Sequence, residues 1–439
     1  MRRIAITPTV LIWLAGASQG ADLPDAPKPP AGLPSFKIQE IDSGLKIGYA
    51  VIATDIDGDA KPDIVVVDQH KVVWYQNPTW KKRVLLDGKT KPDNVCIAAL
   101  DIDGDKLPEL VIGAGWKPFD TKNPGTLQWL KRGKSLDDEW TMHAIPCDEP
   151  TVHRVRCFDT DGDGKPEIVM APLMGRESTK EKNWMDGRPV RIVSYKVPAK
   201  DPQKPENWKS TVLSEELHVV HNFQESKGAK SLFYGVSYEG LHRFAADKDG
   251  KWSGTKIGDG DQSTPKASRG ASEVATGARY VADERKRSVP IIMTPDAFAA
   301  TIEPWHGNRA AVYERGEEGK PWTRTVIDEQ LRWGLAVKFA KLTERRSLVE
   351  DQVDDLIIGV RDNPDPKLGD KFTEKRGVRI YRHDEKTKKW ERYILEDGGV
   401  AVEDLIVADL DGDKKPDIVA VGRATGNCRI YWNKGVAAK

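Results

Sequence analysis

The sequence has no excess of either charge, few hydrophobic residues and few cysteines. Lys+Arg and Asp+Glu both number 68, and this balance excludes the basic surface that nucleic-acid binding requires. Hydrophobic residues make up only 38% of the chain, so a core has to come from many short strands that each contribute an apolar face. The four cysteines lack the C-x-x-C spacing of a metal site. Cys147 and Cys157 are close enough in sequence to pair, although spacing alone does not establish a disulfide.

Long apolar runs are also missing after the N-terminus. Arg2 and Arg3 precede an apolar stretch, Ile4–Ala17, and small residues follow it. This pattern predicts a signal peptide at residues 1–20 and a secreted or periplasmic protein. An uncleaved N-terminal anchor is the alternative, but the stretch is shorter than the ~20 residues of a membrane span. Residues 21–35 are rich in Pro and Ala and predict a linker.

One acidic loop of the form D-x-D-G-D-x-x-P-[DE] occurs four times. Each copy follows a short apolar run and precedes another, which predicts the turn of a β-hairpin. The four copies run from Asp55 to Asp63, from Asp101 to Glu109, from Asp159 to Glu167 and from Asp409 to Asp417.

The repeat is longer than this hairpin. A third apolar stretch follows in seven copies, and a fourth stretch that begins with Trp follows in six. The missing seventh copy is Phe36–Asp42, which stands before the first acidic loop. Repeats of four strands with one strand displaced predict an all-β, seven-bladed β-propeller over residues 36–434, closed by its N-terminal strand. The alternative, two β-sandwich domains, does not explain the displaced strand.

The acidic loops have the composition of calcium sites. Calcium takes six to eight oxygen ligands in flexible geometry, and each loop offers carboxylates at positions one, three, five and nine and a backbone carbonyl at position seven. A metal-free acidic turn is the alternative, but four close carboxylates repel one another. The sequence therefore predicts structural calcium at four sets of residues: Asp55, Asp57, Asp59 and Asp63; Asp101, Asp103, Asp105 and Glu109; Asp159, Asp161, Asp163 and Glu167; Asp409, Asp411, Asp413 and Asp417.

A second set of polar residues lies at the opposite end of the predicted first strands. The residue six positions before the first Asp of the loop, or its equivalent, begins the strand nearest the propeller axis. Around the ring this position holds Tyr49, Val95, His153, His221, Glu273, Leu335 and Glu403. Connections from second to third strands share this face, and they contain His306, Arg361 and Arg423.

These residues predict a functional site at the mouth of a central funnel. Two or three neutral imidazoles with a carboxylate suit zinc or a similar cation with an open position, and arginines hold oxyanions. The alternative is a set of hydrogen-bonded polar residues that line a wet channel.

Several stretches match a known pattern. The acidic repeats resemble the FG-GAP/VCBS propeller superfamily, and E-P-W-H-G at 303–307 and A-V-E-D-L at 401–405 resemble the β-propeller domain of aldos-2-ulose dehydratase. The resemblance implies a carbohydrate lyase that dehydrates oxidised sugars such as 1,5-anhydrofructose or glucosone, with zinc in the funnel. It implies ligands or a base at His153, His221 and His306, and acid, base or supporting roles for Glu273 and Glu403.

The chain departs from that family at two points. Trp333-Gly334-Leu335-Ala336 stands where the family has W-G-H-A, so one ring histidine is replaced by Leu335, and no cupin-like sequence follows the propeller. Two functional hypotheses follow. The protein is either an exported sugar dehydratase or a calcium-stabilised propeller that binds a glycan or a protein without turnover. In the first, Tyr49, Arg361 and Arg423 contact a sugar-derived substrate.

Overall fold

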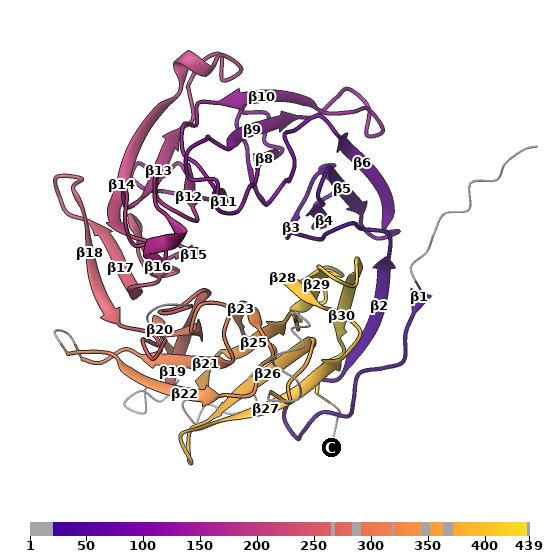
Figure 1. Ribbon diagram of the computed structural model, residues 1–439. Coiled ribbons are helices and arrows are strands. Elements are labelled where there is room, and N and C mark those ends of the chain that lie inside the picture. The colour runs from indigo at the N-terminus through magenta and orange to yellow at the C-terminus, as the bar shows by residue number, and fades with distance from the viewer. Residues whose placement is uncertain are drawn as a thin grey trace, which may run out of the picture.

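Seven antiparallel sheets stand in a ring around a central axis in the computed structural model (Figure 1). The structure describes residues 21–264, 268–282, 291–317, 320–343, 352–362 and 372–436. Each sheet contributes four strands to one blade, which confirms the predicted seven-bladed, all-β propeller. The predicted signal peptide, residues 1–20, lies outside the described residues.

The blades follow one another in chain order, with the first strand nearest the axis. Blades one and two consist of β3 (Ala50–Thr54), β4 (Asp63–Val67), β5 (Lys71–Gln76) and β6 (Lys81–Asp87), and of β7 (Cys96–Leu100), β8 (Glu109–Ala114), β9 (Thr126–Lys131) and β10 (Thr141–Ile145). Blades three and four consist of β11 (Val152–Phe158), β12 (Glu167–Pro172), β13 (Val190–Lys196) and β14 (Lys209–Leu217), and of β15 (Asn222–Glu225), β16 (Leu232–Ser237), β17 (Gly240–Ala246) and β18 (Trp252–Gly258).

The last three blades complete the ring. Blades five and six consist of β19 (Val274–Ala282), β20 (Ile291–Glu303), β21 (Arg309–Glu314) and β22 (Thr323–Asp328), and of β23 (Gly334–Ala340), β25 (Asp355–Val360), β26 (Gly377–Asp384) and β27 (Lys389–Asp397). Blade seven consists of β28 (Val402–Ala408), β29 (Asp417–Gly422), β30 (Cys428–Asn433) and β2 (Phe36–Asp42). The short pieces are β1 (Ala21–Asp22), β24 (Gln352–Val353) and two 3-10 turns, η1 (Lys180–Lys182) and η2 (Pro205–Asn207).

The N-terminal strand closes the ring, as predicted. β2 pairs antiparallel with β30, from Phe36 opposite Asn433 to Asp42 opposite Cys428. The residues predicted as a linker continue along the outer edge of β2: β1 pairs with it, and the backbone N–H of Leu23 donates to Ile38 O at 3.1 Å. This edge therefore carries an additional short strand instead of open backbone groups.

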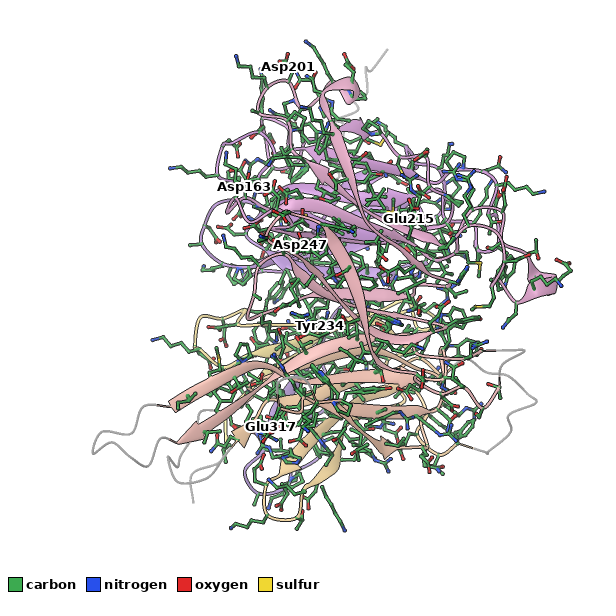
Figure 2. All side chains as sticks on the ribbon, turned by 90° about the vertical axis from the view of Figure 1, so that its left-hand side faces the viewer. Asp163, Asp201, Glu215, Tyr234, Asp247 and Glu317 are labelled. Carbon is green, nitrogen blue, oxygen red and sulfur yellow. The ribbon has the colours of Figure 1, made fainter. Side chains whose placement is uncertain are left out.

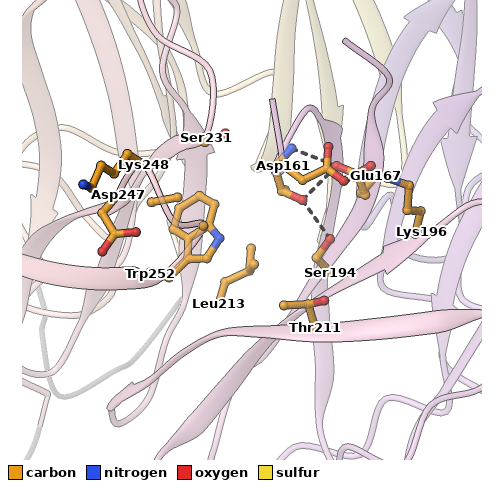
Figure 3. Close-up of a pocket in the computed structure, with 13 residues that line it drawn as sticks. Asp161, Glu167, Ser194, Lys196, Thr211, Leu213, Ser231, Asp247, Lys248 and Trp252 are labelled. Atoms are coloured by element: carbon orange, nitrogen blue, oxygen red, sulfur yellow. Dashed lines mark hydrogen bonds and ion pairs between the residues drawn. The ribbon is translucent and has the colours of Figure 1, made fainter. Parts of the chain in front are cut away.

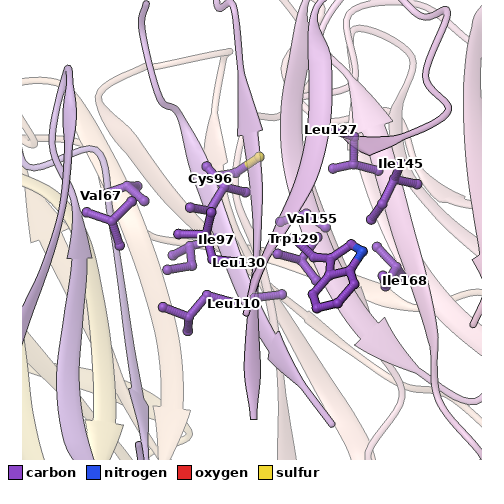
Figure 4. Packing of buried hydrophobic residues seen from close by; sticks show 14 of the residues in the cluster. Val67, Cys96, Ile97, Leu110, Leu127, Trp129, Leu130, Ile145, Val155 and Ile168 are labelled. Atoms are coloured by element: carbon purple, nitrogen blue, oxygen red, sulfur yellow. The ribbon is translucent and has the colours of Figure 1, made fainter. Parts of the chain in front are cut away.

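The core lies between neighbouring blades. Every residue of the second strands β4, β8 and β12 is buried. These strands are packed on both faces, so their apolar residues run continuously and do not alternate with polar ones. Figure 4 shows Val67, Ile97, Leu110 and Trp129 from the first two blades in one cluster with residues of blade three. Repeating this interface around the ring buries a large apolar area in a chain with few hydrophobic residues.

All four cysteines, Cys96, Cys147, Cys157 and Cys428, are free thiols. Burial raises the pKa of the Cys96 and Cys157 thiols to about 12. Within the described ranges, no helix is both long and apolar enough to cross a membrane.

Candidate functional site

The acidic loops and the predicted ring residues lie on opposite faces of the propeller. In each acidic-loop blade the loop joins the first strand to the second, as in β11 and β12, whereas the ring residue stands at or just before the start of the first strand. Because the two strands are antiparallel, these two positions are at opposite ends of the hairpin. Figure 2 shows Asp163, from the third acidic loop, at the left side of the molecule in side view.

Two histidines contact each other directly on the funnel face. His306 Nε2 lies 2.8 Å from His221 Nε2, and the indole Nε1 of Trp333 donates to His306 Nδ1. An indole N–H can only donate, so Nδ1 of the neutral His306 is the acceptor and its proton sits on Nε2. That proton points at His221 Nε2, whose own proton sits on Nδ1, 2.8 Å from both Ser272 O and Glu273 Oε1.

The charges of this group follow from burial. Burial lowers the pKa of His221, and it holds the pKa values of His153 and His306 well below the usual range. Burial by itself raises the pKa of Glu273, but His221, Arg154 and Asn222 outweigh it, and the net pKa is lowered. The group therefore combines neutral imidazoles with one buried carboxylate, and a proton accepted by His221 would be stabilised by Glu273.

His153 belongs to the same cluster, but its nitrogens point elsewhere. Its Nδ1 donates to the backbone oxygen of His221 at 3.0 Å, and its Nε2 faces the Arg154 guanidinium at 3.2 Å. Among the residues that the structure describes, the four acidic loops are the only places where three metal-binding side chains converge. Zinc would also hold two imidazole nitrogens about 3.3 Å apart, whereas His221 and His306 are at hydrogen-bond distance. Zinc in the funnel stays a prediction.

The other half of the funnel is built around Glu403. Arg361 and Arg423 each contact one of its oxygens, at 3.1 and 2.9 Å. The Arg361 guanidinium lies over the Trp333 ring at 4.8 Å, and that of Arg423 over the Tyr49 ring at 5.0 Å. Two guanidinium groups against one carboxylate leave local positive charge, which suits an oxygen-rich ligand.

These contacts form a closed circuit around the mouth of the propeller. Tyr49 donates to Asp93 at 2.7 Å, and the backbone N–H of Trp116 donates to Asp93 O at 3.1 Å. The Trp116 ring then packs on His153, with centroids 4.9 Å apart. We call the connected side chains the funnel ring: Tyr49, Asp93, Trp116, His153, His221, Glu273, His306, Trp333, Arg361, Glu403 and Arg423.

The backbone of this face contains unusual conformations. Thr151, Val219, His306, Trp333 and Asp362 all have φ between 46° and 66°, a left-handed region that is costly for residues other than glycine. Two of them, Thr151 and Val219, stand two residues before the funnel-ring histidines His153 and His221. Such conformations cluster at sites where side-chain direction matters more than local stability, and here one of them positions the Trp333 indole.

The structure brings most of the predicted funnel residues together and adds others. His153, His221, Glu273, His306, Arg361, Glu403, Arg423 and Tyr49 all belong to the ring. Val95 and Leu335 are apolar, 2% and 1% exposed, and belong to the core. Sequence reasoning missed Asp93, Trp116, Arg154 and Trp333. Trp116 stands in a second-to-third connection, so the argument that found His306 also applies to it.

The four acidic loops bring three carboxylates together in each copy. Oxygens from positions one, three and nine lie within 4.8 Å of one another, which fits a calcium ion with oxygen ligands at 2.3–2.6 Å. The position-five carboxylates, among them Asp59 and Asp163, lie outside these triads and turn toward backbone or lysine N–H groups. A calcium ion held by a triad would offset most of the repulsion among its three carboxylates.

The position-nine carboxylates are buried and carry raised pKa values. Burial raises the pKa of Asp63 to about 6 and those of Glu109 and Asp417 to about 7, and it also raises that of Glu167. A carboxylate that is buried beside two others needs a cation or a proton. This requirement supports cation binding by the loops.

This burial predicts a pH dependence for the calcium-free protein. The folded pKa values exceed the unfolded values of about 4, so the folded state binds more protons between pH 4 and 7. The free energy of unfolding in EDTA should therefore fall as pH rises from 5 to 8. Urea denaturation at these pH values measures it, and Asp417→Asn should reduce the slope; an equal slope in the variant contradicts the assignment.

Trp333 should act by holding His306 in one tautomer. Trp333→Phe keeps the ring beneath Arg361 but removes the N–H that occupies His306 Nδ1, so a proton can then reside on Nδ1. The histidine ¹⁵N NMR spectrum should change from a protonated Nε2 to a mixture for one residue. Trp322→Phe, on a blade edge, is the control; an unchanged spectrum in Trp333→Phe disproves the role.

A separate cleft lies on the acidic-loop face between blades three and four. It has a volume of about 520 Å³ and is lined by Trp252, Leu213, Asp161, Glu167 and Lys196 among others (Figure 3). The third acidic loop forms one wall of this cleft, so the cleft and the funnel are separate sites.

Comparison with protein families agrees with the resemblance predicted from the sequence. Residues 124–316 match the family described as aldos-2-ulose dehydratase, beta-propeller domain, and residues 55–112 match the FG-GAP-like repeat. No curated protein sequence matches the chain.

Solved structures share the fold at low sequence identity. A chain of the mitotic checkpoint complex aligns with a TM-score of 0.53 at 9% identity, over 98% of this chain and 100% of that one. A chain of the complex of BBS1N with ARL6DN aligns with a TM-score of 0.50 at 11% identity, over 96% of this chain and 98% of that one. At this identity the likeness shows the fold alone. With the repeats, the fold and the matched segments together, the chain is a seven-bladed β-propeller with FG-GAP-like repeats that resembles the β-propeller domain of aldos-2-ulose dehydratase.

Proposed function

We propose that this protein is an exported, calcium-stabilised propeller that dehydrates a sugar-derived carbonyl compound at the funnel ring. The observation that carries the proposal is the hydrogen-bonded pair of His306 and His221, with Glu273 behind it. A neutral imidazole backed by a carboxylate is suited to remove a proton and to return it. The matched segment 124–316 contains all three residues, which supports a sugar as substrate.

The proposed reaction is an elimination next to a carbonyl group. Substrate displaces the His306 contact, and His221 Nε2 takes the α-proton. The C–H electron pair forms the enediolate, whose oxygen faces the cationic group around Arg361 and Arg423. The β-hydroxyl then leaves with a proton from the His221 imidazolium, and a C=C bond forms. One molecule of substrate thus gives one unsaturated ketone and one molecule of water.

The proposal is tested by incubating pure protein with 1,5-anhydrofructose and with glucosone. Enone absorbance in the ultraviolet should increase with time, and metal analysis of the same sample reports whether zinc is present. If neither substrate gives absorbance, the dehydratase proposal is wrong for both.

The second candidate is a propeller that binds a glycan or a protein without turnover. Leu335, buried in the core where the family has a histidine, is the observation that favours it. Calorimetry with the two sugars separates the candidates: binding heat without enone formation supports the second.

A further inference from the structure

The four acidic loops differ in what faces their carboxylates from the third strand. Strand register makes the copies comparable: Tyr75, Leu130, Tyr195 and Tyr431 pair with the residue after position nine in loops one to four. The next residue along each third strand is therefore equivalent in the four copies. It is Gln76 in loop one, Lys131 in loop two, Lys196 in loop three and Trp432 in loop four.

In loops two and three this residue places an ammonium on the acidic triad. Lys131 Nζ lies 2.5 Å from Asp103 Oδ2. Lys196 Nζ lies 2.5 Å from Asp161 Oδ2 and 2.9 Å from Asp163 Oδ2. Figure 3 shows Lys196 and Asp161 at the wall of the cleft. Loop three also has Lys230 Nζ 2.9 Å from Asp159, so two of its three triad carboxylates face an ammonium.

Loops one and four lack this close contact. Gln76 reaches Asp57 with a neutral amide, and Trp432 donates to Gln39 instead. The lysine nearest the fourth triad, Lys434, is 3.9 Å from Asp411. Lys61 and Lys415 contact only position-five carboxylates, which lie outside the triads.

A second difference divides the loops in the same way. Loops one and four have Asp at position nine, and a backbone N–H at the end of the third strand donates to it: Asn77 to Asp63 at 2.7 Å and Asn433 to Asp417 at 2.8 Å. The amide groups of both asparagines also donate to the backbone oxygen at position eight. Loops two and three have Glu at position nine, with Arg132 and Val197 in place of the asparagines.

We propose that Lys131 and Lys196 are built-in counter-ions, so that calcium fills loops one and four before loops two and three. This inference rests on the proposed calcium binding. To enter these loops, calcium has to displace an ammonium from one triad carboxylate in loop two and from two in loop three. Both lysine side chains are about half exposed, at 49% and 50%, so they can move into water, and the penalty is moderate. We expect affinities about tenfold weaker in these two loops.

Calorimetric titration of calcium into the calcium-free full chain tests the inference. The native protein should show two tight equivalents and two that are about tenfold weaker. The double variant Lys131→Gln, Lys196→Gln copies Gln76 and should move the two weak equivalents toward the tight class. Gln76→Lys should remove one tight equivalent. Lys248→Gln is the control, because this exposed lysine lines the same cleft.

The possible outcomes separate this inference from the calcium proposal. Four equal sites in the native protein, or a double variant with an unchanged titration, overturn the counter-ion inference while calcium binding stands. Absence of any calcium binding in the native protein and in the double variant overturns both. Circular dichroism of each variant confirms that the propeller has folded.

Discussion

His221→Gln should reduce the dehydration rate of 1,5-anhydrofructose by about 10²–10⁴-fold, the range for removal of a general base. The glutamine fills a similar volume and retains a hydrogen-bonding group toward His306, but it cannot accept a proton. Because Glu273 lies against the same imidazole, the variant leaves this carboxylate without the group whose charge it stabilises. Enone absorbance under saturating substrate measures the effect.

Two features make this experiment specific. His143→Gln is the matched control, because His143 lies on β10, the outermost strand of blade two, far along the sheet from the axis. Activity should be unchanged in that variant. The loss should also appear in kcat more than in KM, since the base acts in the transition state. Full activity in His221→Gln would rule out the assigned base.

Removal of calcium should lower the melting temperature by about 5–10 °C. A ligand at 100 times its dissociation constant stabilises the folded state by about 2.7 kcal/mol per site. The entropy of unfolding increases with chain length, so each kcal/mol shifts the melting temperature of a chain of this size only slightly. The expected decrease in melting temperature is still large because calcium would be lost from several loops at once. Differential scanning calorimetry in EDTA and after return of calcium measures it.

A substitution at position nine of an acidic loop tests whether calcium in that loop stabilises the protein. Asp417→Asn removes a charge from the fourth triad and also loses an acceptor for the Leu410 N–H, now 3.1 Å from Asp417 Oδ2. Asp249→Asn, in the exposed β17–β18 hairpin, changes the same charge on the same face. The first should lower the calcium-dependent shift and the second should not. An EDTA scan identical to the calcium scan would exclude a structural role for the ion.

The fold was predictable because each blade repeats the same local pattern. The acidic loop predicted the first hairpin of four blades, and the stretches that begin with Trp80 or Trp140 predicted outer strands. The displaced strand Phe36–Asp42 has the predicted bounds in the structure. The packing of residues 21–34 was not predictable, since a Pro- and Ala-rich composition does not reveal that Leu33 is buried against the blade edge.

The funnel ring was predictable only in part. Equivalent positions at strand starts could be found by alignment, because β-strand register repeats from blade to blade. The role of Trp333 depends on a left-handed backbone and a side-chain direction that no spacing encodes. Asp93 and Arg154 contact side chains of other blades, and such contacts depend on side-chain length and rotamer. The division of the acidic loops also became visible only when strand register aligned Lys131 and Lys196 with Gln76.

The pairing of β2 with β30 closes the ring through a contact between two distant parts of the chain. Phe36 and Asn433 meet across almost the whole chain, and contacts between such distant residues carry a large loop-closure cost. Six blades can assemble from neighbouring sequence, whereas the seventh joins the two ends and sets the circumference of the funnel. The circuit of contacts from Asp93 through His221 to Arg423 can therefore exist only in a finished ring. Separation of β2 from β30 would expose a sheet edge in blade seven and open the ring that holds the funnel residues together.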